Sequence, residues 1–303
     1  MPNPQPVKMI DVATAVGGGE QGFFPFEQFS VHALAQGDSW FSIGAMPPTK
    51  TSNLLLELEV RGLARSTVMV QCGRPGKVLK RFMNTTREKD FLRMMRGPLA
   101  RRWSVIMISG VGNDLIAAVG SDPGEAPEAR LLRTPAERPA LINSAADFVS
   151  EPGWTAFVGH VSVVFNELVD LRDQGLNNGV PMLFHNYAPM TPRPSGAGLG
   201  SGPWLQPALD AYAVPDTQRI ALADELLTRV NALIGNLLAG REAAHPGSNL
   251  HLVDSFNKAG VVRAAAGSSG TSGDWVNEIH LTRAGYRKCA DVWAEVMDAL
   301  PLV

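Results

Sequence analysis

The stretch VHALAQGDSWF, residues 31–41, decides how the rest of the chain is interpreted. Its first half alternates apolar and small residues, which is typical of a buried strand. A glycine then lets the backbone turn sharply, and a serine follows two residues later. A strand that ends in such a turn places the Ser39 hydroxyl at the carboxyl edge of a sheet, where open α/β sheets bind their ligands. Taken alone, Gly-Asp-Ser is also a common turn tripeptide, because Asp and Ser side chains bond to their own backbone.

Length and composition narrow the classes of protein that fit. The chain has 303 residues, of which 45% are hydrophobic, enough for one large α/β domain or two small ones. A net charge of −2 predicts no basic face and argues against nucleic acid as the main partner. No stretch reaches the roughly 18 uncharged apolar residues of a membrane helix, so we predict no transmembrane segment. The first residues lack an apolar signal core, so we expect no Sec export and a cytoplasmic location.

Short apolar runs alternate with segments of helical periodicity along the chain. The runs predict strands over residues 31–37, 66–72, 103–109, 180–185 and 249–254. The periodicity predicts helices near residues 51–62, 86–96, 154–174 and 216–240, and from about 282 onward. This alternation indicates a three-layer α/β/α domain with a five-stranded parallel sheet, whose strand-end loops meet at one edge. We assign residues 31–303 to this single domain, with an irregular arm over 1–30 and insertions at about 121–150 and 187–203.

Four segments with suitable chemistry fall on those predicted loops. The nucleophile candidate Ser39 needs a nearby base, for which His280 is the candidate. The oxyanion that forms in acyl transfer needs fixed donors. The N–H groups of Ser39 and Gly76 and the side-chain amide of Asn113 could supply three of them. Together these segments predict an acyl-transfer site at the carboxyl edge of the sheet.

In the order of these blocks the sequence resembles the SGNH or GDSL hydrolase family. The matching blocks are Gly-Asp-Ser at 37–39, a glycine after the second strand, Gly-Asn-Asp at 112–114 and His280. It is also similar to a subgroup with Gly-Asp-Ser-Trp-Phe at 37–41, His185 and Tyr187, Gly-Pro-Trp-Leu at 202–205 and Trp-x-Asn-Glu-x-His at 275–280. The resemblance spans roughly residues 31–300. It implies a flavodoxin-like sheet and an esterase or lipase-like hydrolase that forms an acyl-enzyme on Ser39.

One position departs from the pattern of the family. The usual last block has aspartate three residues before the histidine, and this chain has Asn277. An aspartate would hold the imidazole tautomer and stabilise the imidazolium, whereas an amide can do only the first. We take Asn277 as the third member by position. Asp274 is the first alternative carboxylate, with Glu278 and Asp254 as further ones.

The remaining candidates have both a structural and a functional interpretation. His185 and Tyr187 follow the fourth strand, so they either line the substrate cleft or form a buried hydrogen-bonded pair. The His and Cys residues show no metal-ligand spacing, so we predict no metal, and the resemblance implies no cofactor. The expected substrate is a small-molecule, lipid or carbohydrate ester. Two alternative functions stay open. One is an acyltransferase that uses the same site, and the other is a catalytically weak binding module with Asn277 in place of aspartate.

Overall fold

The computed structural model describes residues 3–17, 24–42, 52–83, 89–97, 99–198 and 200–302. Its strands form one six-stranded parallel sheet in the order β1-β3-β2-β4-β5-β6. They are β1 (Val7–Asp11), β2 (Val31–Gly37), β3 (Thr67–Gln71), β4 (Val105–Ser109), β5 (Met182–His185) and β6 (Leu250–Val253). The predicted parallel α/β architecture is confirmed, since all five predicted strands belong to this sheet.

The sheet has six strands and not the predicted five, because the N-terminal arm is not wholly irregular. Strand β1 lies at the edge of the sheet and pairs in parallel with β3, with Val7 opposite Thr67. Its sequence, VKMID, lacks a clean alternation, and only Val7 and Ile10 are buried. A strand of this kind is completed by pairing with a segment some sixty residues away, which a local pattern does not reveal.

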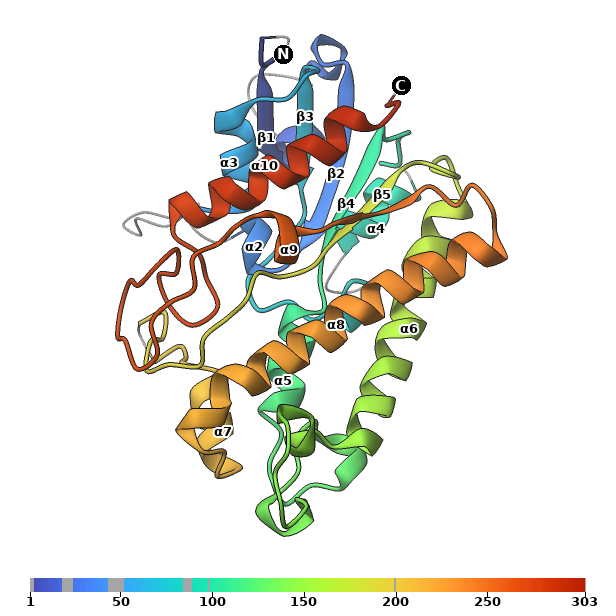
Figure 1. Cartoon of the computed structure of the whole chain (residues 1–303). Helices are drawn as coiled ribbons and strands as arrows, with labels where there is room; N and C mark the ends of the chain where they lie inside the picture. Colours follow the sequence, from blue (N-terminus) through green and yellow to red (C-terminus); the bar gives the residue numbers. More distant parts are fainter. Residues whose placement is uncertain are drawn as a thin grey trace.

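Helices cover both faces of the sheet (Figure 1). Helices α3 (Leu54–Arg61) and α10 (Arg283–Ala299) pack together on one side, and α6 (Glu151–Asp173) and α8 (Asp216–Ala244) lie on the other. The shorter helices are α1 (Val12–Ala15), α2 (Ser39–Ser42), α4 (Lys89–Met95), α5 (Gly112–Val119), α7 (Leu205–Ala211) and α9 (Ser255–Lys258). In the part of the chain that the structure describes, no helix is both long and apolar enough to cross a membrane.

Some helix limits differ from the predicted ones. Helix α8 contains Gly235 and runs past Gly240 to Ala244, because each glycine inside a long helix costs only about 1 kcal/mol. Helix α6 begins at Glu151, where the Ser150 side chain accepts a hydrogen bond from the Gly153 N–H. The predicted insertion over 121–150 contains three short 3-10 helices, η3 (Pro127–Ala129), η4 (Pro135–Glu137) and η5 (Ala145–Phe148).

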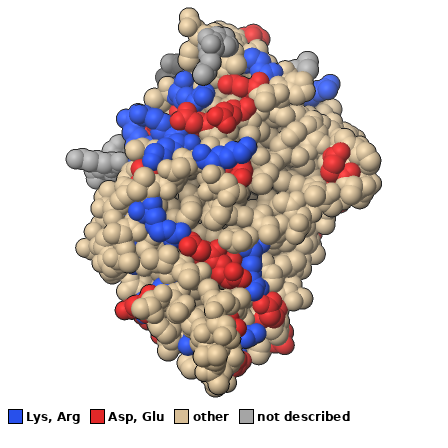
Figure 2. Space-filling view, viewed as in Figure 1, with Lys and Arg blue, Asp and Glu red and all other residues tan. Residues whose placement is uncertain are grey.

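Charges of both signs share the surface over α3 and α10 (Figure 2). Arg283 and Arg287 of α10 pair with the buried Glu57 of α3 at 2.9 and 3.3 Å. Arg61 pairs with Asp291 at 2.6 Å. The basic side chains on this face are therefore matched by acidic ones, in keeping with the net charge of −2.

The packing of β2 against β4 explains the glycine that precedes the candidate nucleophile. Gly37 lies opposite Ser109 in the register of these two strands. A Cβ atom on Gly37 would come within 2.7 Å of the Ser109 Cβ and 3.0 Å of the Ser109 carbonyl oxygen. Glycine is needed here because the strands approach closely, and Ser39 then starts α2 at the carboxyl edge of the sheet.

Candidate active site

Ser39 and His280 meet at the carboxyl edge of the sheet, although 241 residues separate them. Ser39 is the first residue of α2, directly after β2, and His280 belongs to the loop that leads into α10. The Ser39 Oγ lies 2.9 Å from the His280 Nε2. Both residues are buried, with 5% and 4% of their surface exposed. The pair has the geometry in which an imidazole can take the proton of a serine hydroxyl.

Asn277 lies beside the other ring nitrogen of His280. The Asn277 Oδ1 accepts hydrogen bonds from the backbone N–H groups of Ile279, at 3.1 Å, and His280, at 2.8 Å. The His280 Nδ1 is 3.1 Å from both the Oδ1 and the Nδ2 of Asn277. If Nδ1–H donates to Oδ1, the free Nε2 can act as a base toward Ser39. If Nδ2 donates to Nδ1, the ring hydrogen lies on Nε2, and Nε2 then cannot take the serine proton.

The three alternative carboxylates accept hydrogen bonds from groups other than the His280 ring. Asp274 accepts a hydrogen bond from the Lys288 Nζ at 2.7 Å. Asp254 binds two asparagine side chains, both at distances near 2.7–2.8 Å. Glu278 accepts hydrogen bonds from backbone N–H groups. Of the four candidates for the third position, Asn277 is the one that the structure places at the imidazole.

Burial sets the protonation of the candidate base. It lowers the pKa of His280 from its ordinary value of 6.5 to about 4. An adjacent carboxylate would act in the opposite direction, because a negative charge favours the imidazolium. His280 is therefore neutral at pH 7, which is the form that a general base requires.

Asn113 joins two of the predicted blocks. It lies in the first turn of α5, after Val111, whose φ of 80° is rare for a β-branched residue. The Asn113 Nδ2 donates to the Lys77 carbonyl at 3.0 Å. A side-chain amide has two hydrogens, so one remains for another acceptor. Gly76, with φ at +70°, directly precedes Lys77 and so belongs to the turn that Asn113 reaches.

A small cavity opens next to these groups. Ser39 and Asn113 contribute polar atoms to it, and its apolar wall contains Trp40, Ile116, Met190 and Ile279. The space open to the centre of a water-sized group is about 20 Å³. The Trp40 indole N–H donates to the Ile279 carbonyl at 3.2 Å. This bond connects the serine turn, residues 37–40, to the histidine loop, residues 275–280. This cavity therefore borders both Ser39 and Asn113.

Asp38 fixes the serine turn through hydrogen bonds of its buried carboxylate. The sequence pattern did not predict this role, although Asp38 is part of the Gly-Asp-Ser block. One carboxylate oxygen accepts from the Trp40 N–H at 2.9 Å and from the Ser109 hydroxyl at 2.8 Å. The other accepts from the Tyr187 hydroxyl at 2.6 Å. Burial raises the pKa of Asp38 to about 6. These bonds connect the serine turn to strand β4 and to the segment after β5.

His185 and Tyr187 lie behind the serine turn and are buried. The His185 Nε2 is 2.8 Å from the Ser109 Oγ, and its ring centre is 4.8 Å from that of Tyr187. Burial lowers the pKa of His185 to about 3, so the ring is neutral. Both residues are thus buried and hydrogen-bonded, but to Ser109 and Asp38 and not to each other, and Tyr187 also borders the cavity at Ser39.

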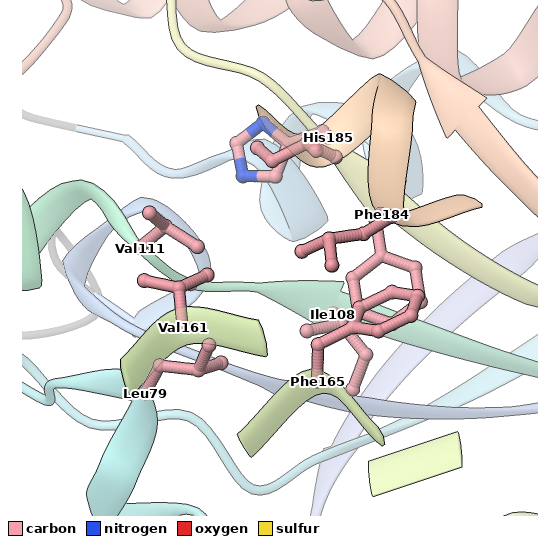
Figure 3. A pocket seen from close by; sticks show the side chains of 10 residues that line it. Leu79, Ile108, Val111, Val161, Phe165, Phe184 and His185 are labelled. Atoms are coloured by element: carbon pink, nitrogen blue, oxygen red, sulfur yellow. The ribbon is translucent and has the colours of Figure 1, made fainter. Parts of the chain in front are cut away.

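A second, apolar cavity lies beyond His185 (Figure 3). Phe184, Ile108, Val161 and Phe165 are among the side chains that line it. The space open to the centre of a water-sized group is about 10 Å³. That is close to the room that one water molecule needs, so the cavity is too small for an acyl chain.

The two cysteines, Cys72 and Cys289, are both buried. Burial raises the pKa of the Cys289 thiol to about 12. Among the residues that the structure describes, no cluster of three or more His, Cys, Asp or Glu could hold a metal ion.

Comparison with known proteins finds similarity at the level of structure. No family model and no curated protein sequence matches the chain. A phospholipase A1 from Streptomyces albidoflavus is similar at 13% identity and a TM-score of 0.47, over 89% of this chain and 99% of that one. An acetylxylan esterase from Geobacillus stearothermophilus is similar at 12% identity and a TM-score of 0.44, over 88% and 93%.

A protein described as a GDSL-like lipase, from Parabacteroides merdae, is similar at 13% identity and a TM-score of 0.41, over 88% of this chain and 94% of that one. GDSL is the family that the sequence blocks resemble. At these identities the substrate does not carry over, so the function is inferred below from the residues of the site. A lipase, a phospholipase and an esterase are thus what this chain is similar to.

Proposed function

We propose that the protein is a GDSL-type serine hydrolase that cleaves carboxylic esters through an acyl-enzyme on Ser39. The observation that carries this proposal is the 2.9 Å approach of the Ser39 Oγ to the His280 Nε2. Ser39 also borders a cavity that Asn113 lines. The candidate nucleophile therefore contacts its candidate base and shares a cavity with the candidate oxyanion donor.

The reaction begins when the Ser39 Oγ attacks the acyl carbon and the His280 Nε2 takes the hydroxyl proton. The oxyanion accepts hydrogen bonds from the Ser39 N–H, the Asn113 Nδ2 and the Gly76 N–H. The imidazolium then gives its proton to the departing alkoxide. A water molecule attacks the acyl-enzyme while His280 takes its proton, and the acid leaves as the Ser39 hydroxyl is restored.

A catalytically weak binding module is the second candidate, and one observation favours it. The His280 Nδ1 is equally far from the donor and the acceptor of the Asn277 amide. If Nδ2 is the partner, the ring hydrogen faces Ser39 and the base is blocked. The two functions therefore differ in which tautomer His280 adopts.

Covalent labelling separates the two functions. We expect a fluorophosphonate to modify the wild-type protein at Ser39, as measured by intact mass and peptide mapping. Ser39→Ala should remain unlabelled, and His280→Ala should label far more slowly because the base is absent. A folded wild-type protein that resists the label, and that does not turn over p-nitrophenyl acetate, would favour the binding module.

A further inference from the structure

Glu278 is a fully buried carboxylate that binds the backbone of a distant segment. Its exposed fraction is 0%. The carboxylate accepts hydrogen bonds from the N–H groups of Trp204 at 2.5 Å, Leu205 at 2.6 Å and Gln206 at 2.8 Å, at the start of α7. It also accepts from the Arg193 N–H at 3.0 Å. One side chain therefore binds the loop that precedes α7 at Arg193 and again at the start of the helix.

The residue that Glu278 holds most directly is in contact with the candidate base. The Trp204 ring meets the His280 ring edge to face, with centres 5.7 Å apart and planes at 85°. The Trp204 ring also lies close to Gly202, where a Cβ atom would come within 2.7 Å of it. Glycine at 202 therefore leaves room for the indole, which contacts the imidazole.

The loop is bound a second time, near Arg193. The buried Arg193 guanidinium donates to the carbonyl of Gly270 at 2.5 Å, and the Ser195 Oγ accepts from the Gly270 N–H at 3.1 Å. The Glu278 N–H donates to the Ser195 carbonyl at 3.0 Å. The segment before α7 is therefore bonded at Arg193 and Ser195 to Gly270 and Glu278, and Trp204 is its point of contact with the base.

We propose that Glu278 is a positioning residue, which holds Trp204 against His280 and so keeps water away from the catalytic base. This inference deepens the proposed function and rests on it. Burying a carboxylate is costly, and four N–H donors offset that cost only when the loop is in this place. The arrangement accounts for the burial that keeps His280 neutral.

Glu278 could affect the pKa of His280 in two ways, and the two predict shifts of opposite sign, so a measurement distinguishes them. If the carboxylate acted by its charge, removing it would lower the pKa of His280. If it acts by holding Trp204, removing it admits water and raises that pKa toward its ordinary value. The titratable groups around this part of the site include the buried Arg193, which is bonded to Glu278. They also include Asp38, Tyr187 and Tyr286 around Trp40, and Asp38 and Tyr187 are bonded to each other.

The test compares Glu278→Gln and Trp204→Ala with the wild type and with Glu57→Gln as a matched control. Glu57 is equally inaccessible, but it binds the Ser52 hydroxyl and the Arg283 guanidinium, away from the site. The first readout is the pKa of the His280 ring from an NMR titration. The second is the acid limb of the pH profile of kcat/KM, where activity falls as His280 is protonated. The NMR readout does not depend on turnover.

We expect both site variants to raise the pKa of His280 by about one unit or more above the value near 4 of the wild type. We expect kcat at pH 7 to fall on the order of tenfold to a hundredfold, with a smaller change in KM. The double variant should shift the pKa no further than either single one, because both remove the same cover. Glu57→Gln should change stability alone.

An unchanged or lowered pKa of His280 in Glu278→Gln would overturn the proposal. Where that variant does not fold, Trp204→Ala decides, because it keeps the backbone N–H groups that Glu278 binds. A wild type that shows no esterase activity, but whose His280 pKa rises in the variants, would contradict the proposed function and leave the positioning intact. A wild type with esterase activity, together with an unchanged His280 pKa in both variants, would contradict the positioning and leave the proposed function intact.

Discussion

The serine turn, residues 37–40, and the histidine loop, residues 275–280, use carboxylates in parallel ways. Each has a buried carboxylate close to its reactive residue in the sequence, Asp38 beside Ser39 and Glu278 two residues before His280. In neither case is the reactive atom its bonding partner. Asp38 binds side chains and backbone of the sheet edge, whereas Glu278 binds the backbone of a loop and a helix start.

The difference lies in what each segment is attached to. The serine turn is bonded to the ends of β4 and β5, so its position follows from the sheet itself. The histidine loop takes its position from the segment before α7, which is irregular. The Trp40 indole, bonded to the Ile279 carbonyl, links the two. The nucleophile is therefore placed by regular structure and the base by loops, and the loops are where substitutions should tune the activity.

The largest effect should come from the nucleophile. Ser39→Ala removes the attacking oxygen, and loss of such a group costs on the order of a million-fold in kcat in a model serine protease. Turnover of p-nitrophenyl acetate measures it, with circular dichroism as the control for folding. Near-wild-type turnover by the purified variant would exclude Ser39 as the nucleophile.

The next effect should come from the oxyanion donor. Asn113→Ala removes a side-chain donor worth about 3–4 kcal/mol in the transition state, so kcat should fall far more than KM rises. The variant also loses the bond to the Lys77 carbonyl, so thermal unfolding should be measured alongside. An effect confined to KM, or one that follows the loss of stability, would assign Asn113 to the turn and not to the oxyanion.

A smaller effect, in the opposite direction, is expected at the third position. Asn277→Asp can only accept from the His280 Nδ1, so it selects the tautomer in which Nε2 is a base. We expect kcat/KM at pH 7 to rise about tenfold and the acid limb to move above pH 4, because the new charge raises the pKa of His280.

Asp274→Asn is the matched comparison for that change. It alters a carboxylate of the same loop region that is bonded to Lys288, so it should leave the acid limb in place. A loss of activity in Asp274→Asn together with no gain in Asn277→Asp would reverse the assignment of the third member.

The smallest effect should come from Asp38→Asn. The amide keeps an acceptor for the Trp40 N–H and Ser109, and its NH₂ can donate to Tyr187, whose hydroxyl then turns to the Gly110 carbonyl 3.0 Å away. We expect the free energy of unfolding at pH 7 to change by less than about 1 kcal/mol, because each bond has a replacement.

The same variant tests the pKa of Asp38. That pKa is about 6 in the folded protein and 3.8 ordinarily, so the folded state holds a proton that the unfolded state has lost. Ionisation of Asp38 thus costs stability as the pH rises from about 4 to 6. Denaturation at pH 4 and pH 7 should show the wild type gaining about 2 kcal/mol relative to the variant at the lower pH. An equal change in the free energy of unfolding for the wild type and the variant would show that Asp38 does not titrate between pH 4 and pH 7.

Several parts of the candidate site could be read from short patterns. Apolar runs followed by turn residues place Ser39, Asn113 and the glycine turn at strand ends, because parallel strands share one carboxyl edge. The same reasoning does not reach β1, whose mixed pattern becomes a strand only beside β3. Nor does it reach the role of Gly37, which depends on how closely Ser109 approaches.

The amino-acid sequence by itself determined the parallel α/β architecture and the identity of the serine, amide and imidazole candidates. These follow from periodicity and turn chemistry, which act over a few residues. Only the tertiary structure decided which group faces the His280 Nδ1 and which carboxylate is bonded elsewhere. Asn277 and Glu278 are neighbours in the chain, yet one lies at the imidazole and the other binds a segment more than seventy residues away. A hydrogen bond is settled by distance in space, and long-range packing alone sets that distance.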